Sequence, residues 1–130
     1  MGCDIHIAVE KKVRDGWVMV DRLHYQTNKD ACNRNYRRFA KLAGVRGDGP
    51  EPKGLPADIS ESADLYVEEW EGDAHSHSWL PAEEAAKIFL ETEYEHEERS
   101  DYRKKYPLEH YFGIDDEKSS DYRIVFFFDN

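Results

Sequence analysis

The chain has 130 residues, with 28 acidic and 18 basic side chains, and its formal net charge is −10. This charge excludes a protein that grips duplex DNA or an anionic membrane over a broad surface, because such binding needs a positive footprint. The length indicates one domain over residues 1–130, whose core draws on 8 Tyr, 6 Phe and 3 Trp. No apolar run approaches the roughly 20 residues of a membrane-spanning helix, so we expect a cytoplasmic protein without membrane contact.

The expected fold class is α+β, a single domain with an antiparallel sheet that includes the N- and C-terminal strands and is packed by two main helices. The first strand is indicated by strict alternation of apolar and polar residues, and Asp15-Gly16 is a hairpin-turn signal. In chain order we expect a strand over 3–10, a strand over 17–21, a helix over 33–43, a loop over 44–60, a short helix over 60–70, an extended segment over 75–80, a helix from 81 to about 99, a polar segment over 100–121 and a central strand over 122–129.

The loop over 44–60 is rich in glycine and proline, which prevents regular structure. At about 17 residues it is longer than a usual connection between elements. Long loops of this kind tend to bind ligands or to cover a site. We therefore expect a binding loop or a lid here.

The charge is unevenly spread along the chain. Residues 1–53 hold 11 basic and 7 acidic side chains, whereas residues 54–130 hold 7 basic and 21 acidic ones. A local positive zone can therefore exist within an acidic molecule, which suits a small anionic ligand better than a nucleic-acid polymer.

Two segments place titratable side chains at alternate positions. Asp4 and His6 fall on the same face of the expected first strand. If the second segment is extended, His75 and His77 also project together. The sequence therefore offers a possible four-residue site, on the condition that the two segments meet in space.

Such a site could work in either of two ways. Carboxylate and imidazole groups are usual ligands of Zn or Mn, so Asp4, His6, His75 and His77 could hold a divalent metal. Without metal, one histidine could act as base and another as acid in phosphoester cleavage. The competing interpretation is that Asp4 and His6 form an ordinary surface pair and that residues 75–78 form a polar loop.

Candidate anion-binding residues lie around the first expected helix. Arg34 and Asn35 stand at its N-terminal end, where helices offer unpaired N–H groups, and Arg46 follows its C-terminal end. The planar guanidinium group matches the geometry of a phosphate. We expect these three residues to contact a ligand, and we expect Arg37 and Arg38 on a solvated helix face.

Other polar and aromatic residues have simpler interpretations. Ser78 could act as a nucleophile, but no Gly-x-Ser-x-Gly motif surrounds it, so we expect its hydroxyl to cap a turn or to contact the ligand. Trp79 is expected to stack on the ligand or to form a pocket wall. The acidic run over 91–98 reads as a solvated helix face. Core or interface positions are expected for Tyr102, Tyr106 and Tyr111, and reduced buried thiols for Cys3 and Cys32.

Several blocks of the sequence form a specific combination. They are Met1 to Ile7, Arg34-Asn35-Tyr36 with Phe39-Ala40, Leu42 to Arg46, Gly54-Leu55-Pro56, His75 to Leu80 and the terminal Phe128-Asp129. Together these blocks resemble a widespread family of small phage-encoded proteins, most of them without an assigned reaction. The resemblance implies a protein made in an infected bacterial cell, and not a structural part of the virion.

The residue chemistry and this setting favour a phage accessory counter-defence protein that binds and hydrolyses a small nucleotide signal, such as a cyclic nucleotide, in the host cytoplasm. One alternative is a non-catalytic sponge that sequesters such a nucleotide. A second alternative is an acidic protein-binding inhibitor, such as a DNA mimic, that uses the acidic segment 54–130 and depends on its acidic run over 91–98. The expected partner is a small nucleotide and neither a long nucleic acid nor a membrane, and a homo-oligomer remains open.

Overall fold

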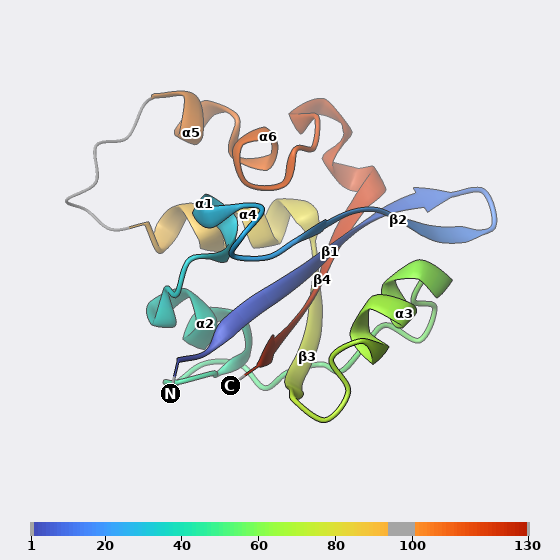
Figure 1. Cartoon of the computed structure of the whole chain (residues 1–130). Helices are drawn as coiled ribbons and strands as arrows, with labels where there is room; N and C mark the ends of the chain where they lie inside the picture. The colour runs from blue at the N-terminus through green and yellow to red at the C-terminus, as the bar shows by residue number, and fades with distance from the viewer. Residues whose placement is uncertain (1, 94–100, 130) are drawn as a thin grey trace.

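The computed structural model describes residues 2–93 and 101–129. Four strands form one antiparallel sheet in the order β2-β1-β4-β3. The strands are β1 (Asp4–Val13), β2 (Gly16–Leu23), β3 (Ala74–Pro81) and β4 (Tyr122–Asp129). The two terminal strands are the central pair, and both chain ends lie at the same end of the sheet (Figure 1).

The alternation of side chains divides the sheet into two faces. Ile5 lies opposite Phe128 across the central strand pair and Ile7 lies opposite Phe126, and all four side chains are buried. The residues that alternate with these four, such as Ala8, point to the other face, because successive strand residues alternate. Both faces are therefore apolar over the central strands, as a covered sheet requires.

Helices cover the two faces unequally (Figure 1). The Ile5 face packs against α1, α2, α4 and α6 around a large apolar cluster. The opposite face packs against α3 around a smaller cluster, and we call it the α3 face. The helices are α1 (Lys29–Cys32), α2 (Tyr36–Ala43), α3 (Glu61–Glu68), α4 (Ala82–Glu91), α5 (Asp101–Lys105), α6 (Pro107–Phe112) and the 3₁₀ helix η1 (Asp116–Asp121). The expected α+β fold is confirmed.

Helix boundaries follow local capping chemistry. The expected helix over 33–43 begins later, at Tyr36, because the Asn35 side chain accepts a hydrogen bond from the backbone N–H of Arg38. It ends as expected at Gly44, whose φ of 69° is left-handed. The helix expected to start at Pro81 ends at Glu91, and the expected extension to residue 99 falls partly outside the described residues.

Arg38 is buried, contrary to the expectation of a solvated side chain. Its guanidinium group lies 4.3 Å from the Phe89 ring centroid and 5.5 Å from that of Tyr111. It donates to Thr92 Oγ1 at 2.9 Å and to the Phe89 carbonyl at 2.8 Å, and it lies 3.9 Å from Glu93. These hydrogen bonds replace water, which is why a charged side chain can lie in the core.

Glu93 is likewise buried, although the acidic run suggested a solvated face. Its carboxylate accepts a hydrogen bond from the Tyr111 hydroxyl and lies 3.0 Å from Arg103. Glu93 therefore connects the end of α4 to α5 and α6. Residues 94–98 of the same run lie outside the described residues.

Two further features complete the description. Cys3 and Cys32 are free and buried, as expected. Within residues 2–93 and 101–129, no helix is long and apolar enough to cross a membrane.

Candidate functional site

The His6 pocket is a hollow of about 330 Å³ on the α3 face, at the end of the sheet where the two chain ends meet. Strands β1 and β4 form its base, and the segments after β2 and α3 form its sides. Its lining residues are Asp4, His6, Arg22, His24, Tyr25, Gln26, Tyr66, Glu69, Trp70 and Asp129.

At the base of this pocket, His6 connects a carboxylate to a phenol. Its Nε2 lies 2.6 Å from Oδ2 of Asp129, and its Nδ1 lies 3.4 Å from the Tyr66 hydroxyl. The tautomer that carries its proton on Nε2 donates to the Asp129 carboxylate and leaves Nδ1 to accept from the Tyr66 hydroxyl. Burial raises the pKa of Tyr66, so its hydroxyl stays protonated at neutral pH.

Aromatic rings hold the His6 imidazole in place. The Phe127 ring stacks on it with centroids 5.1 Å apart, and the Trp70 ring lies 4.1 Å away. Only 4% of His6 is exposed to solvent. The imidazole is therefore fixed in orientation by both its neighbours and its two hydrogen-bonding contacts.

Two carboxylates face each other across the central strands at the pocket. Asp4 and Asp129 are directly paired in the sheet, and such like charges repel. Each has its own partner, since His6 binds Asp129 and Arg34 binds Asp4 through Nε at 2.8 Å and Nη2 at 3.3 Å. The hydrogen bond from Arg34 holds the pKa of Asp4 below its usual value, against the effect of burial.

The rim of the pocket is exposed and carries both signs of charge. Arg22 lies 3.4 Å from Glu69, and its guanidinium group lies 5.3 Å from the Tyr66 ring centroid. Next to the rim is an adjoining hollow of about 530 Å³, lined by Asp4, Tyr25 and Arg34. Asp4 and Tyr25 border both hollows, so Arg34 lies next to the His6 pocket.

A β-bulge in β3 separates the other two candidate histidines. His75 pairs with Phe128 and Ser78 pairs with Phe126, so two residues of β3 lie opposite Phe127. Ser76 takes a left-handed φ of 56° within this bulge. His75 consequently lies beside Phe128, on the Ile5 face, whereas His77 stacks on Phe127 on the α3 face. The expectation that the two project together is wrong.

The four expected centre residues therefore do not meet. His6 and His77 both stack on Phe127, but they belong to strands on opposite sides of β4, so the ring lies between them. His77 borders a separate hollow of about 280 Å³ beside the end of α3. In the described ranges, no three His, Cys, Asp or Glu side chains are grouped so that they could hold a metal ion.

The other expected ligand residues have varied positions. Asn35 is 1% exposed and binds the Thr92 carbonyl at 2.7 Å while capping α2, and Ser78 is buried and accepts from the backbone N–H of Lys53 at 3.1 Å. Both are structural contacts. Arg46 is exposed and lies over the Tyr36 ring, whereas Trp79 lies on the α3 face opposite Val125 and borders a different hollow from His6.

Sequence reasoning missed several residues of the His6 pocket. Asp129 was recognised only as part of a terminal block, although both chain ends were expected in one sheet. Its alternation with Phe127 is a signal that puts the two side chains on one face of the sheet, but its position beside Asp4 depends on the pairing register of the two strands. Tyr66 and Trp70 carry no such signal, because their arrival at the pocket depends on how α3 crosses the sheet.

No family model, curated protein or solved structure matches this chain.

Proposed function

We propose that the chain binds a small nucleotide in the His6 pocket and holds it intact, as a sponge for a nucleotide signal. The observation that carries this proposal is the convergence of three kinds of group in one hollow. Trp70 and Tyr25 offer rings on which a base can stack. Arg22 and Arg34 offer guanidinium groups for phosphate at the rim.

The carboxylates provide the third kind of group. A ribose hydroxyl or the exocyclic amine of a base donates hydrogen bonds, and carboxylates accept them. Asp4 and Asp129 lie at the base of the pocket with their orientations fixed by Arg34 and His6. A nucleotide carries donors, a ring and an anionic group in one molecule, and so it matches the whole set.

The size of the site supports a small ligand. The His6 pocket of about 330 Å³ and the adjoining hollow of about 530 Å³ fall in the range of small-molecule sites. Most of the polar groups lie in a concavity and not along an open surface track. A long nucleic acid needs such a track of positive charge, which the chain with its net charge of −10 is not expected to provide.

Binding is favoured over cleavage because His6 is already engaged at both ring nitrogens. A general base must reach the proton that it removes, either directly or through one water. The other two candidate histidines lie elsewhere on the sheet. The remaining histidine of the pocket lining, His24, accepts a hydrogen bond at Nδ1 from the backbone N–H of Gln26 at 3.3 Å. The pocket therefore has more groups that can bind a ligand than histidines placed to act as a base.

Hydrolysis is the second candidate, and one observation favours it. Asp129, His6 and Tyr66 form a carboxylate–imidazole–hydroxyl chain, the order of groups in nucleophilic triads. A ligand hydroxyl or water that displaced Tyr66 from Nδ1 would meet an oriented base. In that case the protein would be a phosphodiesterase that needs no metal ion.

The biological setting rests on the resemblance to small phage-encoded proteins. It supports a counter-defence role in the cytoplasm of an infected bacterial cell. Sequestering a host nucleotide signal is a role that a single small pocket can perform. Each chain would then hold one nucleotide in its His6 pocket.

The test is calorimetric titration with 3′,5′-cyclic mononucleotides and cyclic dinucleotides, followed by denaturation and chromatography of the ligand. We expect at least one to bind and to be recovered intact. Arg34→Gln should weaken this binding by about tenfold, since a charged hydrogen bond is worth about 1.5–3 kcal/mol. Lys41→Gln is the matched control, because Lys41 also forms an exposed ion pair, with Glu91 at 3.6 Å, outside the pocket.

Three results would argue against the sponge. Failure of every nucleotide to bind at 1 mM would contradict the proposal as a whole. Equal weakening by Arg34→Gln and Lys41→Gln would place the ligand outside the His6 pocket. Conversion of the ligand by the wild-type protein, abolished in His6→Gln, would replace sequestration with hydrolysis.

A further inference from the structure

Another hollow, of about 790 Å³, lies at the opposite end of the α3 face from the His6 pocket. We call it the tryptophan groove, after Trp17 and Trp79 in its lining. Tyr122 and Pro56 add further apolar surface. The groove shares no lining residue with the His6 pocket.

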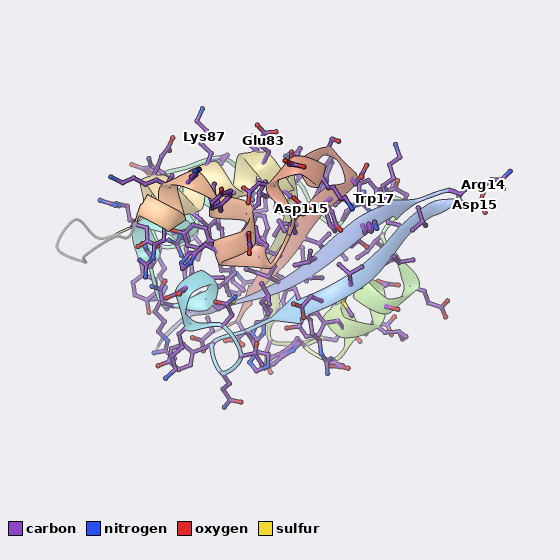
Figure 2. The ribbon with its side chains drawn as sticks, turned by 90° about the horizontal axis from the view of Figure 1, so that it is seen from above. Arg14, Asp15, Trp17, Glu83, Lys87 and Asp115 are labelled. Atoms are coloured by element: carbon purple, nitrogen blue, oxygen red, sulfur yellow. The ribbon has the colours of Figure 1, made fainter. Side chains whose placement is uncertain are left out.

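The groove arises because the β1–β2 hairpin extends beyond the rest of the sheet. β1 pairs with β2 as far as Val13 and Gly16, whereas its pairing with β4 stops at Lys11 and Tyr122. The tip with Arg14 therefore projects from the body of the protein (Figure 2). Residues 55–58 of the loop expected to bind a ligand form the facing wall.

The loop is anchored on the side of the groove. The backbone N–H of Gly54 donates to the His77 carbonyl at 2.9 Å, and that of Ser60 donates to the buried Glu10 carboxylate at 2.8 Å. The segment between these two anchors is short, so the facing wall has little freedom to move. The sequence predicted a binding loop at this position, and the nucleotide site proposed above does not use it.

Arg123 holds the aromatic walls in place. Its guanidinium group lies 4.0 Å from the Trp17 ring centroid and 5.8 Å from that of Trp79, and the residue is 4% exposed. It donates to Glu10 at 2.5 Å and to Asp58 at 2.8 Å, and Trp17 Nε1 donates to the same Asp58 carboxylate at 3.1 Å. The rings are thus ordered before any ligand arrives, which lowers the entropic cost of binding.

The charge at the groove is positive. Lys12, Arg14 and Arg123 line it, and Asp58 is the sole acidic residue in the described lining. Arg123 is shared between Asp58 and the buried Glu10, so the positive charge of the groove comes from Lys12 and Arg14. Lys12 and Arg14 are exposed near the hairpin tip, so the open end of the groove attracts anions although the whole chain has a net charge of −10.

We propose that the tryptophan groove is a second ligand site, which binds a planar aromatic anion. The ligand ring packs against the wall that Trp17 and Trp79 form around the Arg123 guanidinium group, which contacts both tryptophan rings, and the anionic group reaches Lys12 or Arg14. An aromatic carboxylate and a nucleoside phosphate share this chemistry. The proposal is independent of the nucleotide site, because the two hollows have different residues and lie at opposite ends of the α3 face.

Titrations with indole-3-acetate and with adenosine monophosphate test the proposal and distinguish the two sources. The three tryptophans give three indole N–H signals in a ¹H–¹⁵N spectrum, and two of them belong to the groove. We expect one or both anions to shift the Trp17 and Trp79 signals before that of Trp70. The neutral compounds indole and adenosine should bind about tenfold more weakly, because they lack the anionic group.

Charge-neutral variants locate the anionic group. The double substitution Lys12→Gln and Arg14→Gln should weaken binding of the effective anion by about tenfold. Lys87→Gln is the control, because Lys87 is an exposed lysine on α4, which packs against the other face of the sheet (Figure 2). Both changes remove surface charge without touching a buried side chain.

Each remaining outcome overturns the proposal. No shift of Trp17 and Trp79 at 10 mM of either anion would show that the groove is not a site for this chemistry. Equal binding of the neutral compounds, or no effect of the double substitution, would show that the groove does not recognise an anion. A shift confined to Trp70 would assign the ligand to the His6 pocket alone.

Discussion

Replacement of Arg38 by methionine tests the buried charge network that joins α2 to α4. Arg38 is 1% exposed, and its guanidinium group donates to Thr92 and to the Phe89 carbonyl while it faces Glu93. Methionine keeps most of the aliphatic stem and its packing, so the substitution removes mainly the polar contacts. Glu93 then remains buried with one cation fewer nearby.

The expected loss of stability is large. Breaking a buried ion pair by removing one partner costs about 3–5 kcal/mol, because the remaining charge is left poorly compensated. We expect about 4 kcal/mol for Arg38→Met, at the middle of that range. With a urea m value of about 2 kcal/mol per molar, the unfolding midpoint falls by about 2 M.

Arg37→Met is the matched control for this measurement. Arg37 is the preceding residue, is exposed, and donates to the backbone carbonyls of Glu91 and Glu93 at 3.3 and 3.1 Å. Its loss should cost less than about 1 kcal/mol. Urea unfolding followed by circular dichroism gives both values. A difference of less than 1 kcal/mol between the two variants would refute the inference that Arg38 is held in a buried network.

Three further predictions concern titratable groups. Arg34→Gln should raise the pKa of Asp4 toward its usual value, which a carboxyl ¹³C NMR titration of both proteins measures; an unchanged pKa would contradict the Arg34 contact. Burial lowers the pKa of His77, so the unfolded chain binds more protons than the folded chain, and the free energy of unfolding should fall as the pH drops below about 6.5. His77→Gln should reduce this pH dependence of the free energy of unfolding. An unchanged pH dependence would count against the burial of this ring. Burial raises the pKa of Cys32 to about 12, so a disulfide reagent at pH 8 should label it only at the rate of unfolding, whereas immediate labelling would show an accessible thiol.

The sheet was predictable because its signal is local. Alternation in residues 3–10 and the apolar run at 124–128 each specify a strand, and the large apolar side chains make the terminal strand central. The turn at Gly16 and the helix end at Gly44 were predictable for a similar reason, since glycine tolerates positive φ.

The positions of single charged residues were less predictable. Arg38 follows Arg37 in the sequence, and nothing local distinguishes the buried side chain from the exposed one. The difference arises from α4 and α6, which surround Arg38 with ring faces and hydrogen-bond acceptors. Glu93 was assigned to solvent for the same reason, although tertiary contacts bury it.

The candidate site was predicted in part. Asp4 and His6 do lie in one pocket, because two-residue spacing on a regular strand is a reliable geometric rule. The same rule failed for His75 and His77, because Ser76 adopts a left-handed conformation that glycine or asparagine would have signalled but serine does not. Asp129 was missed because the pairing register of two distant strands is not encoded in either strand alone.

The most direct test of the account follows Trp70 in a ¹H–¹⁵N titration with the cyclic nucleotide that binds most tightly. Trp70 lies 4.1 Å from His6, at the centre of the proposed site. We expect its indole signal to shift and to saturate as one nucleotide fills the His6 pocket, independently of any change at Trp17 and Trp79. Saturable binding that leaves the Trp70 signal unchanged would contradict the assignment of the nucleotide to the His6 pocket.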